Sequence, residues 1–280
     1  MMNPGRIFTF LFLFILLFLA SCLPEQKLAQ SFVKSGPKIR LLVTPPDYLY
    51  LYNHKGEAID GFSEMSDKQQ DSALFSSSLF IQRISDSTML EDYVNQFISA
   101  LRAANFEVYL PDQIDSFLVS QAQSYKVNIS QIQLDEYTYP LEDKQPINDT
   151  VYYRRFNLNA MDFSVWLELS KVNTDKPRKT LLYDSQSAFD SFDGNFIVDP
   201  WSNAVRYKYH IDSLGLADVY DMAKYLGRKH GEYLFDFFMN QWVAFNMPQN
   251  QYDLYYYHYD RRKKIMETTD EDRFEILPNK

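Results

Sequence analysis

A strand, a long amphipathic helix and a second strand follow one another between residues 38 and 110, and this order limits the fold more than any other feature. Lys38–Thr44 (KIRLLVT) predicts a buried strand, which ends at two prolines because neither offers an N–H to a ladder. The helix has one apolar stripe at steps of three and four residues. Phe106–Leu110 (FEVYL) then predicts the second strand, so we expect a crossover unit on one sheet. The stripe consists of Leu90, Tyr93, Val94, Phe97, Ile98, Leu101 and Ala104.

The ends of this helix also have sequence signals. Thr88 and Glu91 have the spacing of a capping box, and Asn105 suits a left-handed helix end. Before the helix, residues 47–71 predict a long surface excursion that contains Tyr48, Tyr50 and Tyr52. Other short elements are expected at 79–84, as a strand, and at 112–124, as a helix with Ile114, Phe117 and Leu118 on one face.

The middle of the chain alternates between apolar and polar residues, as half-exposed strands do. In the segment 125–139 the apolar parity changes, since Val127 and Ile129 point one way and Ile132 and Leu134 the other. A β-bulge near Ser130 or Gln131 would restore one apolar face. Residues 163–169 and 179–189 predict a hairpin joined by a turn at 173–178. We expect a loop at 141–150, turns at 192–195 and 199–201, and a strand at 205–211.

The longest predicted helix covers Leu216 to Asn246. Within it, Gly227 and Gly231 stand four residues apart and share a face with Ala223. Each glycine costs about 1 kcal/mol relative to alanine, so the pair indicates close approach of another element. The sequence as a whole predicts an α+β fold: a mixed, mostly antiparallel sheet with an early crossover unit, packed by helices that include this long C-terminal one. The core stripe expected for this helix includes Val219, Ala223, Leu226, Leu234, Phe237, Phe238, Trp242 and Phe245.

The C-terminal region is aromatic and then basic. Residues 252–260 (YDLYYYHYD) precede four consecutive cations at 261–264, which predicts a hairpin with the basic residues in its turn. The alternative is an exposed aromatic platform beside cations, able to hold a glycan or a partner. Residues 268–280 are expected to be a loosely held end.

The N-terminus has the pattern of an export signal. A single arginine, Arg6, precedes an apolar run over 7–19, which matches the n-region and h-region of a secretory signal. Leu19-Ala20-Ser21-Cys22 follows, and Cys22 is the single cysteine of the chain. These four residues resemble the lipobox of bacterial lipoproteins. An uncleaved, marginal transmembrane helix is the alternative.

The resemblance implies that a signal peptidase recognises Leu19, Ala20 and Ser21 and cleaves before Cys22. It also implies a diacylglycerol on the Cys22 sulfur and a third acyl chain, such as palmitate, on its amino group. Two or more chains hold a protein stably on a membrane. The expected organisation is a signal peptide at 1–21, a lipidated tether at 22–37, a single α+β domain at 38–267 and an end at 268–280.

The location follows from the same resemblance. The residues after Cys22 lack the aspartate that retains lipoproteins in the inner membrane of enteric bacteria, and they lack the acidic run that exports many to the surface in Bacteroidota. We therefore expect an outer-membrane protein of the bacterial cell envelope that faces the periplasm. The chain also resembles, in general character, uncharacterised Bacteroidota envelope lipoproteins.

The charge of the chain excludes a class of partner. Its 28 Lys and Arg and 37 Asp and Glu give a net charge of −9, or −10 once Arg6 is removed with the signal. No nucleic-acid binding is expected, because that would need a basic face. The net charge also gains nothing from an anionic membrane surface, so the lipid is expected to do the anchoring.

No catalytic, cofactor-binding or metal-binding motif is found, so we assign no such residues. Phosphate-binding glycine loops and a Gly-x-Ser-x-Gly elbow are missing from the sequence. The four histidines lack metal spacing. Paired carboxylates remain open, with Asp135-Glu136, Asp190/Asp193 and Asp218/Asp221 equally well interpreted as solvated faces. The histidines are His54, His210, His230 and His258.

Three functions are consistent with these features. The first is a non-enzymatic envelope lipoprotein, an accessory or assembly subunit that binds another envelope protein. The second is a glycan-binding or small-ligand-binding lipoprotein that uses the tyrosines of 48–52 or 252–259, whose rings would then be exposed on one concave face. The third is an envelope hydrolase, which requires two acids that converge in a cleft.

Overall fold

The computed structural model describes residues 24–119, 123–172, 179–247 and 255–278. The chain divides into two compact units. Of the described residues, 39–231 and 274–278 belong to the large unit, and 24–38 and 232–273 to the small unit, with the gaps given above. Among the described residues, no helix is long and apolar enough to cross a membrane. The predicted α+β class is confirmed.

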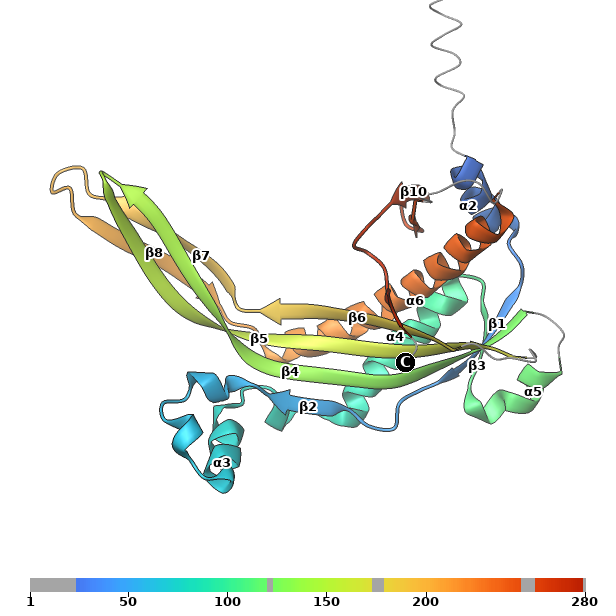
Figure 1. The fold of residues 1–280 in the computed structure, drawn as a ribbon, viewed down its shortest axis with the longest axis horizontal. Helices are drawn as coiled ribbons and strands as arrows, with labels where there is room; N and C mark the ends of the chain where they lie inside the picture. The colour runs from blue at the N-terminus through green and yellow to red at the C-terminus, as the bar shows by residue number, and fades with distance from the viewer. Residues whose placement is uncertain (1–23, 120–122, 173–178, 248–254, 279–280) are drawn as a thin grey trace, which may run out of the picture. The chain divides into compact units, whose positions relative to one another are not determined.

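A mixed sheet forms the large unit (Figure 1). In its described part the strand order is β11-β6-β5-β4-β1-β3, and β2 also pairs with β4. The pairs β1–β3, β1–β4 and β2–β4 are parallel, whereas β4–β5, β5–β6 and β6–β11 are antiparallel. The strands are β1 (Ile39–Thr44), β2 (Tyr50–Asn53), β3 (Glu107–Tyr109), β4 (Gln123–Ile147), β5 (Thr150–Lys171), β6 (Lys179–Phe189) and β11 (Glu275–Leu277).

The predicted crossover unit is present, because α4 (Asp86–Ala103) joins the parallel strands β1 and β3. The helix begins earlier than its apolar stripe suggested: Ser85 is the N-cap, and its Oγ accepts a hydrogen bond from the Thr88 amide. Asn105 has φ 63°, the predicted left-handed end. The predicted strand at 79–84 is wrong, since this segment holds the 3₁₀ turn η3 (Ile81–Arg83).

Residues 47–71 are more ordered than a surface excursion. They contain β2, and the chain then continues through 3₁₀ turns into a helix before it reaches α4. We call residues 55–84 the insertion. Its elements are η1 (Lys55–Ala58), η2 (Phe62–Glu64), α3 (Asp67–Ser77) and η3. After β3, the expected helix at 112–124 is a 3₁₀ turn, η4 (Pro111–Gln113), and the short α5 (Ile114–Leu118), of which Phe117 is buried but Ile114 and Leu118 are exposed.

The bulge predicted in β4 is confirmed, because the β4–β5 register shifts between Ile129 and Gln131. Val127 and Ile129 before the bulge, and Ile132 and Leu134 after it, are all buried as a result. They pack on the same side of the sheet as α4, where the rings of Tyr93 and Phe163 stack. The predicted alternation at 163–169 and the return strand at 179–189 are also present.

The predicted loop at 141–150 is wrong, and β4 and β5 instead run on as one long hairpin. Its two-residue turn places Asn148 and Asp149 at φ 49° and 62°, as a type I′ turn requires. The second expected turn, at 192–195, is also wrong, since it lies inside β7 (Ser191–Val198). The break at 199–201 is present and separates β7 from β8 (Val205–Asp212).

These strands form an arm of the large unit. Figure 1 shows the outer halves of β4 and β5 extending away from the rest of the sheet, with β7 and β8 beside them. Aromatic rings join the two hairpins: the Phe156 ring centroid lies 4.8 Å from that of Phe192 and 4.9 Å from that of Tyr209. The Tyr207 hydroxyl also donates to Asp143 Oδ2 across 2.6 Å.

The long helix α6 (Leu216–Asn246) has the predicted bounds. Its two glycines lie against α4, where a Cβ on Gly227 would come within 2.2 Å of the Tyr93 carbonyl oxygen and one on Gly231 within 2.6 Å of the Ala100 Cβ. The predicted close approach is therefore correct. The core stripe is wrong for Phe245, whose side chain is 86% exposed.

The small unit contains α2 (Pro24–Ser35), residues 232–246 of α6, and a hairpin of β9 (Tyr257–Asp260) and β10 (Ile265–Thr268). The tether expected at 22–37 thus contains a helix, which packs through Phe32 on Phe235 and Trp242 at ring centroid distances of 5.4 and 6.2 Å. The hairpin has the basic residues 261–264 in its turn, as predicted. The end expected to be loosely held contains the sheet strand β11.

Candidate functional site

One face of the sheet in the large unit carries polar and aromatic side chains instead of a core. The other face packs on the helices, since Asp184 of β6 contacts His230 of α6 across 2.9 Å. We call the polar side the open face. Residues paired across β2, β4, β5 and β6 form rows on this face. One row is Tyr50, Gln133, Ser164 and Ser185, and the next is Tyr52, Asp135, Asp162 and Ser187. Trp166 of β5 and Tyr183 of β6 form a further pair.

The tyrosines at 48–52 form a strip, because Tyr50 and Tyr52 occupy alternate positions of β2 and Tyr48 lies just before that strand. Tyr48 and Tyr52 are exposed, as the ligand-binding hypothesis requires. The Tyr48 and Tyr50 hydroxyls share a hydrogen bond of 2.7 Å. The Tyr52 ring stacks on that of His54 at 6.2 Å. The strip therefore presents fixed rings to solvent.

Two carboxylates meet at the end of this strip. Asp135 and Asp162 are direct partners on the antiparallel strands β4 and β5, so their side chains leave the same face side by side. His54 Nε2 lies 2.8 Å from Asp135 Oδ1, and Gln133 donates to both Asp135 oxygens at 3.0 and 2.8 Å. Tyr137 donates its hydroxyl to Asp162 Oδ1 at 2.9 Å. Both acids are thus held in defined orientations.

A pocket of about 980 Å³ opens between these acids and the insertion. Asp135, Asp162 and Tyr137 form its sheet side, whereas His54 and Glu57 belong to the segment that leaves β2. Three acids and no lysine or arginine line the pocket, so it favours a neutral or cationic ligand over an anion. The other lining residues are Asn53, Gly56, Ile59, Gly61, Phe62, Ser63, Leu74 and Thr138.

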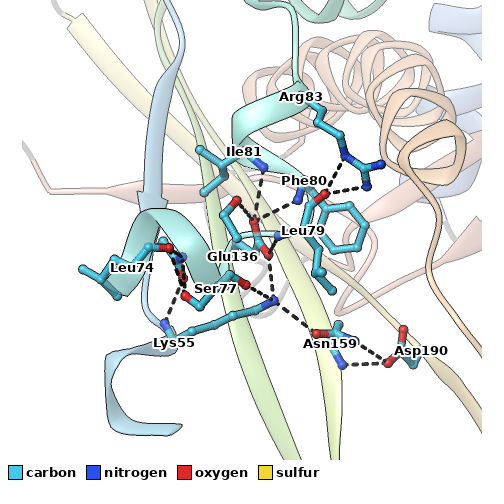
Figure 2. A network of polar contacts seen from close by, with 12 residues as sticks. Lys55, Leu74, Ser77, Leu79, Phe80, Ile81, Arg83, Glu136, Asn159 and Asp190 are labelled. Carbon is cyan, nitrogen blue, oxygen red and sulfur yellow. Dashed lines mark hydrogen bonds and ion pairs between the residues drawn. The ribbon is translucent and has the colours of Figure 1, made fainter. Parts of the chain in front are cut away.

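A buried ion pair fixes the wall of this pocket (Figure 2). Glu136 is fully buried, and its Oε1 accepts a hydrogen bond from Lys55 Nζ at 2.7 Å. The same carboxylate accepts from the Ser78 hydroxyl at 2.8 Å and from the Leu79 amide at 2.6 Å. Both ends of the insertion are therefore tied to one side chain of β4, which leaves the pocket preorganised.

The pKa of Glu136 reflects this network. Burial raises the pKa, but the Leu79 amide, the Lys55 ammonium and the Ile81 and Ser78 donors outweigh it and hold the pKa below its usual value. The carboxylate is therefore ionised at neutral pH. Both carboxylate oxygens of Glu136 accept hydrogen bonds from groups of the protein, so we assign the Lys55–Glu136 ion pair a structural role.

The network continues to the base of the arm. Lys55 also donates to Asn159 Oδ1 at 3.1 Å, and the Asn159 side chain donates to Asp190 Oδ2 at 3.0 Å (Figure 2). Asp190 lies between β6 and β7, and its Oδ1 accepts from the Leu214 amide ahead of α6. Asp190 and Glu136 are buried, so their interpretation as solvated residues is wrong.

The predicted lipidation site, Cys22, lies outside the described residues, as do Leu19, Ala20 and Ser21. The second tyrosine stretch is divided: residues 252–254 lie outside the described chain, Tyr255 is exposed and Tyr257 is buried. Of the two aromatic stretches, the one at 48–52 therefore fits a ligand surface.

The histidines are dispersed. His54 lines the pocket, His210 pairs with Asp212 on the arm, His230 is buried, and His258 pairs with Asp236 in the small unit. Within the described residues, no group of three or more His, Cys, Asp or Glu side chains is arranged to hold a metal ion.

No model of a known protein family matches the sequence, and a search of curated proteins gives no significant match. The site is therefore interpreted from its own geometry.

Proposed function

We propose that this chain is a lipid-anchored, non-enzymatic binding protein of the bacterial envelope, and that its pocket binds a neutral glycan. The observation that carries the proposal is the placement of the paired acids Asp135 and Asp162 beside Tyr52 on the open face. Carboxylates are acceptors only, so they suit the hydroxyl donors of a sugar. An aromatic ring beside them offers its face to the apolar C–H surface of the same sugar.

The charge and size of the pocket support the same ligand. Three acids without a lysine or arginine disfavour acidic polymers. A volume of about 980 Å³ is large enough for more than one sugar ring. The strip at Tyr48 to Tyr52 continues along the open face from the pocket, which favours an oligosaccharide over a single sugar.

The test is calorimetry of the mature chain with neutral gluco-, manno- and xylo-oligosaccharides. We expect the double variant Asp135→Asn/Asp162→Asn to weaken binding at least about tenfold, since hydrogen bonds to charged groups contribute roughly 1.5–3 kcal/mol. Tyr52→Ala should also weaken it. Tyr153→Ala is the matched control, because that tyrosine is exposed on the arm.

Lack of binding to every sugar, or binding that the pocket variants leave unchanged, would contradict the proposal. The same mixtures should be examined for shortened oligosaccharides after long incubation. Their appearance, with loss in Asp135→Asn, would instead support the hydrolase, whose two acids this pocket also provides.

The arm favours a second candidate function, that of an accessory subunit that binds another envelope protein. Trp201 is 95% exposed in the turn between β7 and β8. Asp199 Oδ1 accepts hydrogen bonds from the Trp201 and Ser202 amides, each at 2.9 Å, so the turn is held in shape. An exposed tryptophan on a fixed turn is typical of a binding hot spot.

A photo-crosslinking residue in place of Trp201 tests this candidate in intact cells. We expect one envelope protein to be captured, and a probe at Lys68 in α3 to capture none. Equal capture at both positions would contradict a role for the arm.

A further inference from the structure

The turn at 261–264 between β9 and β10, which we call the basic turn, is held in shape by hydrogen bonds. Asp260 Oδ1 accepts hydrogen bonds from the Arg262 and Lys263 amides, each at 2.9 Å. Lys264 adopts φ 57°, the left-handed conformation that closes the turn. These hydrogen bonds, led by the Lys263 amide, hold the pKa of Asp260 below its usual value. The turn therefore has a defined shape.

The first cation of the turn is fixed, whereas the next three point to solvent. The Arg261 guanidinium lies 4.0 Å from the centroid of the Phe235 ring, so it packs on α6. Arg262, Lys263 and Lys264 are exposed, and Lys263 remains 67% exposed although it pairs with Asp260. Three adjacent cations are thus presented by a chain whose net charge is −9.

The hairpin is tied to the start of α2. The Tyr257 hydroxyl, at the first residue of β9, donates to Glu25 Oε2 at 3.4 Å. Tyr257 is itself fixed to α6, since its amide donates to Asn240 Oδ1 at 2.8 Å. Glu25 lies in the first turn of α2, so the hairpin and this helix end are neighbours within one unit.

The lipid attachment point predicted from the sequence lies two residues before α2. Two residues of extended chain reach about 7 Å at most, so acyl chains on Cys22 would hold the first turn of α2 close to the headgroups. The basic turn follows directly on β9, so the exposed cations belong to the same hairpin as the residue that contacts Glu25.

We propose that the exposed cations Arg262, Lys263 and Lys264 bind the anionic phospholipid headgroups of the membrane in which Cys22 is anchored. This inference rests on the proposed lipid anchor and refines it. The net charge of the chain predicts no attraction to an anionic surface, but the three exposed side chains of the basic turn are positive. Polybasic segments next to a membrane anchor gain from that surface.

The test uses the acylated mature chain in vesicles of phosphatidylcholine, with or without phosphatidylglycerol. A fluorophore on Ile265→Cys labels the hairpin at a unique thiol, because the single native cysteine is acylated. Lipids with a nitroxide headgroup quench a fluorophore that lies close to them. We expect at least about twofold more quenching with phosphatidylglycerol, and loss of this difference at high salt.

Two matched triple variants separate local from net charge. Arg262→Gln/Lys263→Gln/Lys264→Gln should remove the dependence on phosphatidylglycerol. Lys68→Gln/Arg206→Gln/Lys208→Gln makes the same change in net charge at exposed positions of the large unit. This variant should retain the dependence of quenching on phosphatidylglycerol. Equal quenching in both vesicles, or equal loss in both variants, would overturn the proposal.

Intact mass distinguishes this failure from failure of the anchor. An acylated chain whose hairpin ignores phosphatidylglycerol retains the lipid anchor and contradicts the basic contact. A chain without acyl groups on Cys22 removes the anchor and this proposal together, whatever the sugar-binding result.

Discussion

At the scale of single residues, two adjacent acids of β4 have opposite roles. Asp135 faces the pocket, and Glu136 is buried against Lys55. Alternation after the predicted bulge puts Glu136 on the inward side with Ile132 and Leu134, but the sequence does not identify Lys55 as the partner of this buried acid. The buried member of such a pair is the costly one to change.

Glu136→Gln is expected to destabilise the large unit by about 3–5 kcal/mol, because it leaves the Lys55 ammonium buried without a counter-charge. Urea denaturation measures this change. Glu142→Gln, which alters an exposed carboxylate paired with Lys144 and Arg155, is the control and should cost less than about 1 kcal/mol. Equal effects of the two variants would show that the Glu136 network is not a structural tie.

A pH dependence is expected from His258 and Asp236 in the small unit, whose side chains lie 2.6 Å apart. The hydrogen bond to Asp236 raises the pKa of His258, while burial raises that of Asp236 to about 6. Both folded pKa values exceed the unfolded ones, so the associated stability is present at low pH and is lost as pH rises through about 6 and above.

Fluorescence of Trp242 can follow this unit, with Trp166→Phe and Trp201→Phe present to remove the other two tryptophans. We expect a lower unfolding midpoint at pH 8 than at pH 6. The variant His258→Asn should show a smaller difference between the unfolding midpoints at pH 6 and pH 8. A midpoint that rises between pH 6 and pH 8 would contradict the assignment.

At the scale of elements, periodicity located the crossover unit, the bulge and α6, since each depends on spacing within one segment. It failed at 141–150, where charged residues and prolines concealed two strands exposed on an arm. Residues 141–147 have no fully buried side chain, so the alternation there is too weak to detect. Interpreting Asn148-Asp149 as a two-residue turn would have paired Ile147 with Thr150 and so fixed the register of the hairpin. Asp135 lies twelve residues before Ile147 and Asp162 lies twelve residues after Thr150, so this register pairs the two acids. The pairing of Asp135 with Asp162 could therefore have been predicted only by recognising this one turn.

The contact of α6 with α4 makes a sharp prediction for Gly227→Ala. Alanine should favour the helix by about 1 kcal/mol, but its Cβ would come within 2.2 Å of the Tyr93 carbonyl oxygen. We expect a net loss of roughly 1–3 kcal/mol in urea denaturation, because backbone cannot yield as a flexible side chain can. Asp221→Ala, at an exposed site of the same helix, should change stability by less than about 0.5 kcal/mol. A stabilised Gly227→Ala variant would show that the helices separate freely.

At the scale of the whole molecule, the proposed lipid anchor would hold the protein at a membrane. The helix α2 begins at Pro24, so few residues separate the predicted anchor from a folded unit. Long flexible tethers would allow a binding protein to search far from its membrane, whereas a short one keeps it close.

Cys22→Ser should move the protein from the membrane fraction to a soluble fraction and abolish incorporation of labelled palmitate, because a single acyl chain or none gives only marginal binding. The control is Ser35→Ala, an exposed change in α2, which should leave fractionation unchanged. Persistent membrane association of the Cys22→Ser variant without palmitate would point to another means of attachment.

The one-residue offset between Ile129 and Gln131 has a consequence for how this sequence can vary. Deleting Ser130 would remove the extra residue and leave Ile129 and Ile132 in regular alternation, so Asp135 would still face the pocket and Glu136 the interior. A lineage can therefore lose this one codon without disturbing the two acids, whereas a codon lost between Ile132 and Asp135 would turn Asp135 inward and Glu136 outward, away from Lys55.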